Sequence, residues 1–331
     1  MDLSTHYLGF KLTHPFMCGA SPLADKLDNV RKMEDAGAAA IVMRSLFEEQ
    51  LIAEGLATAS AMDGPAESFA EALSYLPQPD EFVLGPDEYL EQIRKVKQAV
   101  KVPVIASLNG TTLGGWLDYA KRMQQAGADA LELNVYYLAT DMTEPGEAVV
   151  KRTVDMVRSV KKTVTVPVAV KLSPYYSSFA NVAKQLDAAG VDGMVLFNRF
   201  YQPDIDVETL EVLSDLNLSS SGALLLRLRW LAILSGRIQA DLAVTGGVHT
   251  CLDGVKAVMC GAHAVQMVSA LLQRGPQHLK TIRQDVAQWL EEHEYDSLAQ
   301  MQGSMSLLKV PNPKAYERAN YMHILQSWQP A

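Results

Sequence analysis

Glycines and serines in the last third of the chain have the spacing expected of a phosphate-binding site. Thr245–Gly247 follows the apolar run Asp241–Val244 and precedes a helical pattern, and Ser269 follows the next apolar run. Backbone amides exposed on a tight Gly-Gly turn at a helix start bind a phosphate dianion. Ser221–Gly222, before another helical pattern, could supply a third amide. The alternative is that the Gly-Gly turn only begins a helix.

A single lysine stands inside an apolar, strand-like run. Lys171 is flanked by Val170 and Leu172. An ammonium group is costly to bury among such residues unless it meets an anion. Two interpretations follow, a structural ion pair or a cation beside a cofactor that gains negative charge.

Three asparagines, Asn109, Asn134 and Asn198, end other short apolar runs. A side-chain amide offers two donors and an acceptor, which suits the edge of a heteroaromatic ring. Ser21 and Arg44 follow two earlier runs and add polar groups. Together with the phosphate signal, these residues indicate a site for flavin mononucleotide (FMN).

The elements that must position these residues repeat along the chain. Four segments share a helical pattern, a glycine and a short apolar run: Ala36–Arg44, Ala126–Asn134, Ala189–Asn198 and Cys260–Val268. In each, the glycine stands where a helix needs a left-handed residue after its C-terminus, and the run is typical of a strand buried on both faces. The sequence therefore predicts repeated helix–strand units.

Counting these units predicts an α/β fold, a (β/α)₈ TIM barrel. The predicted strands are Phe16–Cys18, Ala40–Arg44, Val104–Leu108, Ala130–Asn134, Val168–Leu172, Gly193–Phe197, Asp241–Val244 and Ala264–Val268. The predicted helices cover about 25–36, 86–100, 114–126, 146–162, 177–189, 224–236, 250–260 and 277–293.

Two long stretches, 45–85 and 199–222, are insertions after the second and sixth predicted strands. Insertions after strands fall on the C-terminal face of a barrel, where active sites are built, and the loops after strands seven and eight are the usual phosphate site. We expect a single domain over residues 1–331, with a C-terminal extension after about residue 294.

Composition and charge narrow the classes of function. The chain of 331 residues is 48% hydrophobic and 20% charged, as in globular proteins, and its net charge of −9 disfavours nucleic acid and anionic membranes as partners. The longest apolar stretch, 222–235, is too short to span a bilayer and contains Arg227 and Arg229. The N-terminus lacks a secretion signal, which predicts a cytoplasmic protein. The three cysteines have no Cys-x-x-Cys spacing, and no metal is predicted.

The order of the motifs resembles that in the soluble dihydroorotate dehydrogenases, which are FMN-containing barrels. The resemblance covers about residues 3–300 and rests on Leu8–Met17, Gly19–Ser21, Glu132–Asn134, Val170–Pro174, Asn198, Ser221–Gly222, Thr245–Gly247, Cys260–Ala262 and Val265–Gln266. It implies FMN contacts from Ala20, Ser21, Asn109, Asn134, Lys171, Gly222, Gly246, Gly247 and Ser269. It also implies that Lys171 stabilises the anionic reduced flavin, so the chain is interpreted as a divergent member of that family.

The substrate side departs from the pattern of the family. Tyr137 stands where the family has a Cys or Ser base, and Ala139 replaces an asparagine that binds orotate. The segment Glu67–Leu73 lacks the amides of the corresponding family loop, and Arg44 replaces a common lysine. A phenol can act as a base when a cation lowers its pKa, or as an acid that protonates a carbon. The alternative is that Tyr136 or Tyr137 only stacks on the flavin or packs under a loop.

The resemblance implies an FMN-dependent oxidoreductase of a C–C bond beside a carbonyl. Its small-molecule substrate would be dihydroorotate or a related cyclic carboxylate, with a place in pyrimidine biosynthesis. Electrons would leave to a soluble acceptor or an acceptor protein, since the chain has neither an iron–sulfur motif nor a Rossmann fingerprint. Two alternatives stay open, a non-catalytic flavin-binding electron-transfer subunit and a lyase that forms a Schiff base at Lys171. A homodimer is compatible with the resemblance.

Overall fold

Eight parallel strands form a closed barrel in the order β11-β12-β3-β4-β5-β6-β7-β8. The computed structural model describes residues 1–47, 85–110, 113–213 and 216–327. The barrel strands are β3 (Phe16–Cys18), β4 (Ile41–Phe47), β5 (Val104–Asn109), β6 (Ala130–Asn134), β7 (Val168–Leu172), β8 (Gly193–Leu196), β11 (Asp241–Thr245) and β12 (Ala264–Met267). The predicted (β/α)₈ barrel is confirmed, and each predicted strand overlaps one of these.

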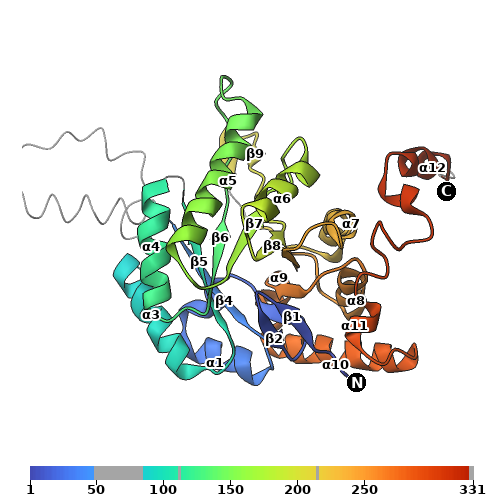
Figure 1. Cartoon of the computed structure of the whole chain (residues 1–331), viewed down its shortest axis with the longest axis horizontal. Helices are drawn as coiled ribbons and strands as arrows, with labels where there is room; N and C mark the ends of the chain where they lie inside the picture. Colours follow the sequence, from blue (N-terminus) through green and yellow to red (C-terminus); the bar gives the residue numbers. More distant parts are fainter. Residues whose placement is uncertain (48–84, 111–112, 214–215, 328–331) are drawn as a thin grey trace, which may run out of the picture.

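Helices surround the barrel (Figure 1). Those that overlap the predicted ones are α1 (Leu27–Asp35), α3 (Pro86–Ala99), α4 (Leu113–Gln125), α5 (Gly146–Thr163), α6 (Phe179–Ala188), α7 (Leu224–Leu234), α8 (Cys251–Met259) and α10 (Gln277–Glu292). A further short helix, α9 (Ser269–Arg274), directly follows β12 and was not predicted. The apolar faces of these helices bury residues such as Ile93, Val157 and Leu186 in one continuous core with the outward side chains of the strands.

The amino-terminal end of the barrel is filled by an antiparallel hairpin, β1 (Thr5–Tyr7) and β2 (Phe10–Leu12). Tyr7 and Leu8 are each 1% exposed, and the Leu8 amide donates a hydrogen bond of 2.8 Å to Asp241. Small side chains on the surrounding strands leave room for the hairpin: Ala130, Ala169, Ala243 and Ala264. This end is therefore packed, and polar inward side chains lie toward the opposite end.

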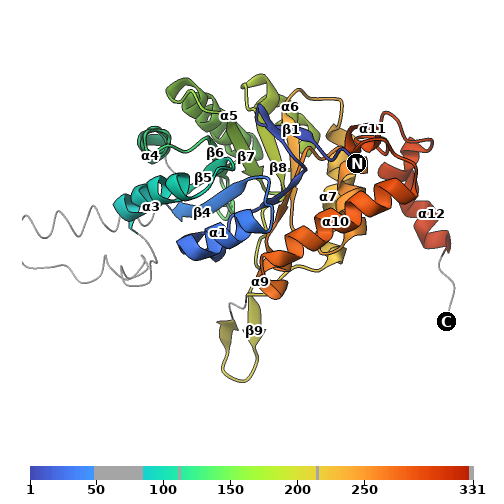
Figure 2. The same ribbon diagram turned by 90° about the horizontal axis from the view of Figure 1, so that it is seen from below.

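The two predicted insertions differ in how far the structure describes them. After β4, residues 48–84 lie outside the described residues, and with them the segment Glu67–Leu73. The insertion after β8 contains an antiparallel hairpin, β9 (Asp204–Asp206) and β10 (Glu211–Leu213), which the sequence did not predict. It stands out from the barrel (Figure 2) and is followed by the short turn η3 (Ser221–Ala223).

The C-terminal segment packs outside the barrel. It comprises α11 (Leu298–Met301), η4 (Pro313–Tyr316) and α12 (Ala319–Ser327), the last of which lies apart from the barrel in Figure 1. Leu298 and Met301 are buried, and the Leu298 amide donates to the carbonyl of Asp2 at 2.9 Å. In the described ranges, no helix combines the length and the apolar character needed to cross a membrane.

Candidate active site

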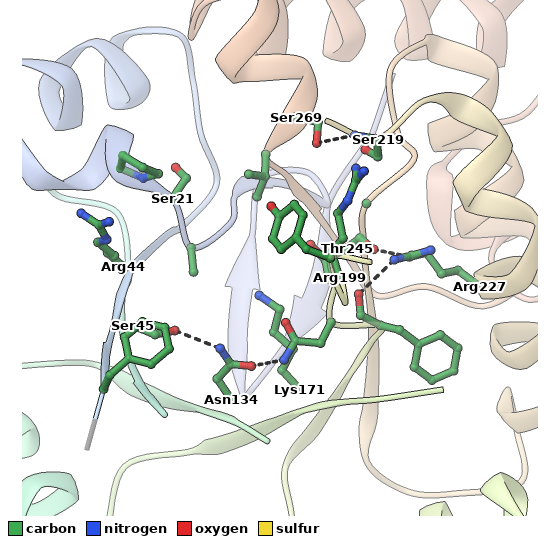
Figure 3. Close-up of a pocket in the computed structure, with 18 residues that line it drawn as sticks. Ser21, Arg44, Ser45, Asn134, Lys171, Arg199, Ser219, Arg227, Thr245 and Ser269 are labelled. Atoms are coloured by element: carbon green, nitrogen blue, oxygen red, sulfur yellow. Dashed lines mark hydrogen bonds between the residues drawn. The ribbon is translucent and has the colours of Figure 1, made fainter. Parts of the chain in front are cut away.

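A cavity of about 300 Å³ lies at the carboxyl ends of the barrel strands (Figure 3). Its volume is at the lower end of the range typical of small-molecule sites. The residues that line it come from most of the strand ends and from α7: Ala20, Ser21, Pro22, Arg44, Ser45, Phe47, Asn134, Lys171, Phe197, Asn198, Arg199, Tyr201, Ser219, Arg227, Thr245, Gly246, Val268 and Ser269.

Most of the residues predicted from the sequence meet in this cavity. Those that line it are Ala20, Ser21, Arg44, Asn134, Lys171, Asn198, Thr245, Gly246 and Ser269. Four other predicted cofactor contacts do not line it. Asn109 is buried at the end of β5, Ser221 donates its hydroxyl to Asp253 at 2.7 Å, Gly222 is exposed, and Gly247 packs against Leu224.

Lys171 belongs to an ion pair and also lines the cavity. Its ammonium lies 3.3 Å from Glu132 of β6, and the Glu132 side chain is 1% exposed. Gln266 of β12 donates its amide to the other Glu132 oxygen at 2.5 Å. Removing one partner of a buried ion pair costs about 3–5 kcal/mol, because the other charge is left unpaired. The position of the ammonium is therefore fixed by three strands.

A chain of hydrogen bonds joins strand ends across the cavity. Asn198 donates its amide to the side-chain oxygen of Asn134. Asn134 donates to the hydroxyl of Ser45 at 3.2 Å, and Ser45 lies 2.7 Å from the hydroxyl of Ser107. These bonds fix the orientation of both amides, so their remaining polar atoms keep a defined direction toward a bound molecule.

The Thr245–Gly247 turn requires its glycines. Gly246 and Gly247 have φ angles of +83° and +87°. A Cβ atom on Gly247 would lie 2.4 Å from the backbone nitrogen of Leu224, where α7 begins. The turn and the start of α7 therefore approach more closely than any side chain would allow.

Ser219, which was not among the predicted site residues, bridges the loops beside this turn. Its amide donates to the hydroxyl of Ser269 at 3.1 Å, and its hydroxyl accepts from the Gly247 amide at 3.2 Å. The same hydroxyl lies 3.2 Å from Nε2 of His249, and burial lowers the pKa of His249. The loops after β8, β11 and β12 thus form one hydrogen-bonded cluster.

Arg227 of α7 is a second cavity residue that was not predicted from the sequence. It is 8% exposed and donates to three backbone carbonyls, those of Thr245, Phe197 at 3.1 Å and Ala223 at 2.6 Å. Burial, and secondarily the charge of Arg199, lower the pKa of Arg227 to about 10, so it stays charged at neutral pH. The available signal was an arginine inside the apolar stretch 222–235.

The cavity is cationic. Arg44, Lys171, Arg199 and Arg227 line it, and no Asp or Glu is among its described lining residues. Arg44 is paired behind the lining with Asp25 at 2.8 Å. A positive cavity in a chain of net charge −9 concentrates the field on an anionic ligand.

Tyr137 lies outside the lining of the cavity. Its hydroxyl donates to Glu144 at 2.7 Å, Arg152 stacks over its ring at 4.6 Å, and Arg152 and Glu144 form an ion pair. The neighbouring Tyr136 stacks on Phe200 at 4.1 Å. The structure therefore does not bring the Tyr137 hydroxyl together with Lys171, and its chemical role stays a prediction.

Comparison with known proteins places this barrel among its relatives. The family model described as Dihydroorotate dehydrogenase matches residues 83–290. The chain belongs to the dihydroorotate dehydrogenase family. This assignment agrees with the resemblance found in the sequence, and at the identities of the relatives below the chain is a divergent member.

Curated members of the dihydroorotate dehydrogenase family are similar over nearly their whole length. The "Dihydroorotate dehydrogenase B (NAD(+)), catalytic subunit" of Thermoplasma acidophilum is 28% identical over 91% of this chain and 98% of its own. The protein of the same name from Methanocaldococcus jannaschii is 26% identical over 88% and 94%. The "Putative dihydroorotate dehydrogenase A (fumarate)" of Aeropyrum pernix is 27% identical over 91% and 97%.

The dihydroorotate dehydrogenase family is flavin-dependent, and the residues of this cavity fit such a group. The Gly-Gly turn and the two arginines near it suit an anionic end. The oriented amides of Asn134 and Asn198 suit a ring edge, and the held ammonium of Lys171 suits a ring that becomes negatively charged.

Proposed function

We propose that this chain is an FMN-dependent oxidoreductase of a C–C bond beside a carbonyl, with dihydroorotate or a related cyclic carboxylate as its substrate. The observation that carries the proposal is the ammonium of Lys171, held by Glu132 in a cationic cavity at the carboxyl ends of the strands. A cation fixed there stabilises negative charge that develops during reduction, without reorganising.

Bound FMN supplies the hydride acceptor. The proposed cofactor contacts are Ala20, Ser21, Arg44, Asn109, Asn134, Lys171, Asn198, Ser221, Gly222, Thr245, Gly246, Gly247 and Ser269. Among these, Thr245–Gly247 and Ser269 hold the phosphate, and Asn134 and Asn198 orient the ring. Lys171 is the proposed catalytic cation.

Tyr137 is the proposed acid or base. Glu144 accepts a hydrogen bond from its hydroxyl and is 14% exposed, while Arg152 is 45% exposed. Because Glu144 can take up a proton, the Tyr137–Glu144 pair provides a route for a proton between the rim of the site and solvent. For Tyr137 to act as acid or base, the reacting carbon of the substrate must lie at the side of the cavity formed by β6.

The names of the relatives bear on the electron acceptor. Several are called the catalytic subunit of an NAD(+) enzyme, and one is named for fumarate. We propose that electrons leave this chain to a partner subunit or to a soluble acceptor. We further propose that the reaction is the oxidation of dihydroorotate to orotate in pyrimidine biosynthesis in the cytoplasm.

The test is the visible spectrum of the purified protein, recorded without oxygen before and after addition of dihydroorotate. A flavin spectrum that bleaches is expected, and NAD⁺ or fumarate is then added to find which one restores it. A flavin spectrum that stays oxidised would remove dihydroorotate as the donor. A colourless protein that takes up no added FMN would reject the proposal.

A further inference from the structure

Arg227 is a buried cation that has no anionic partner among the described residues. The residue is 8% exposed, and the groups that accept the hydrogen bonds of its guanidinium are backbone carbonyls. None of the ion pairs found in the described part of the chain includes it. A buried charge is costly unless it is paired.

A second cation stands next to it. Arg199, on the loop after β8, lines the same cavity, and its charge contributes to the lowered pKa of Arg227. Its guanidinium lies over the ring of Tyr201 at 5.3 Å, and it also has no ion-pair partner among the described residues. Two neighbouring guanidinium groups repel each other, so an anion between them and the turn relieves the repulsion.

Both charges lie beside the Gly-Gly turn. Figure 3 shows Arg199 and Arg227 on the same side of the cavity as Ser219, Thr245 and Ser269, away from Ser21 and Arg44. A Cβ atom on Gly246 would lie 3.0 Å from the Arg227 guanidinium, so the backbone of the Gly-Gly turn packs directly against it. The guanidinium therefore lies directly beside the turn that forms the proposed phosphate cradle.

We propose that Arg227, assisted by Arg199, is the counter-ion of the FMN phosphate and makes the site select the phosphorylated flavin over riboflavin by charge. The inference rests on the proposed function, because it takes FMN as the ligand. Arg227 is also a positioning residue, since its bonds to Thr245, Phe197 and Ala223 join three segments around the cradle. A guanidinium has five N–H donors, so further donors remain beyond these bonds.

The test compares the affinities for FMN and riboflavin of protein stripped of flavin, measured by the quenching of flavin fluorescence. The ratio of the two affinities separates the phosphate contact from general damage, because riboflavin lacks only the phosphate. In Arg227→Met we expect FMN to bind about 10- to 100-fold more weakly, with riboflavin little changed. Arg229→Met, at an exposed position of the same helix, is the matched control and should keep the ratio of the unmodified protein.

Two further variants keep the proposal testable if Arg227→Met does not fold. Arg227→Lys retains the charge and should keep part of the preference for FMN, and Arg199→Met should lower the preference by a smaller factor. Equal weakening of both flavins in the Arg227 variants would overturn the proposal and leave a purely structural role. An unmodified protein that binds both flavins equally would overturn it while leaving the proposed function intact. A protein that binds neither would reject the proposed function itself.

Discussion

Lys171 combines the two roles that its sequence context offered as alternatives. The alternation of β7 places residue 171 inward, level with Asn134 on the neighbouring strand β6. Glu132 is the preceding inward-facing residue of β6 and lies closer to the amino-terminal end of the barrel. It therefore pairs with the ammonium from the side opposite the cavity. An ion pair and a cofactor-facing cation are therefore compatible in one side chain.

Substitution of Tyr137 tests its proposed role in proton transfer. Tyr137→Phe removes the hydroxyl that donates to Glu144 but keeps the ring under Arg152. If the phenol transfers a proton in the reaction, turnover should fall about 10²- to 10⁴-fold, while FMN binds as before. The measurement is the rate of flavin bleaching by substrate, followed by stopped flow.

Tyr136→Phe is the matched control for Tyr137→Phe, because Tyr136 is the adjacent phenol and stacks on Phe200. Its bleaching rate should stay close to that of the unmodified protein. Turnover that survives in Tyr137→Phe would assign Tyr137 to packing with Glu144 and Arg152.

The site residues at strand ends could be predicted from the sequence. Those that a helix or an irregular loop brings to the cavity could not. Asn134 and Thr245 follow from the barrel alone, since each closes a strand, and Lys171 does because it faces inward one residue before the end of β7. Arg227 is brought to the cavity by α7, and Ser219 by an irregular loop. Neither position follows from a periodic pattern, because both depend on how close α7 approaches the Gly-Gly turn.

The barrel strands could be predicted because glycine and proline residues mark their starts. The hairpins β1–β2 and β9–β10 were not, because strands of three residues are too short to show a period of two. The short helix α9 was missed for the same reason of length. Residues 48–84 lie outside the described residues, so the insertion after β4 is known only by its position.

His14 ties β3 to the end of α1 and makes stability depend on pH. Its Nε2 donates to the Gly37 carbonyl at 2.7 Å, and its Nδ1 accepts from the Phe16 amide at 3.2 Å. Burial lowers the pKa of His14 from 6.5 to about 4. Between these values the unfolded chain binds a proton that the folded chain does not bind, so the contribution of His14 to the free energy of unfolding should fall by about 3 kcal/mol as pH drops from 6.5 to 4.

Urea unfolding at several pH values measures this effect. His14→Gln keeps a donor for Gly37 but does not titrate, so its free energy of unfolding should fall less over the same range. His293→Gln, at an exposed position, should behave like the unmodified protein. An unchanged pH dependence in His14→Gln would contradict the assignment.

We propose that the whole chain folds as one domain. β3 pairs with β12, and the Asp2 segment pairs with Ser297, so the first and last thirds of the sequence share one structure. Urea unfolding should then show a single transition that coincides for circular dichroism and tryptophan fluorescence. Trp116 and Trp230 report on opposite halves of the chain, and two separated transitions would contradict the proposal.

The pairing of β3 with β12 also has a consequence during protein synthesis. One edge of β3, and the contacts that the β1–β2 hairpin makes with β11 and β12, lack their partners until residue 267 has left the ribosome. At roughly 5–20 residues per second, that delay is on the order of ten to fifty seconds. The nascent chain carries an open strand edge and an incompletely covered hairpin throughout this time, which is the state that chaperones protect from aggregation. The earliest residues made are thus among the last to reach their final surroundings.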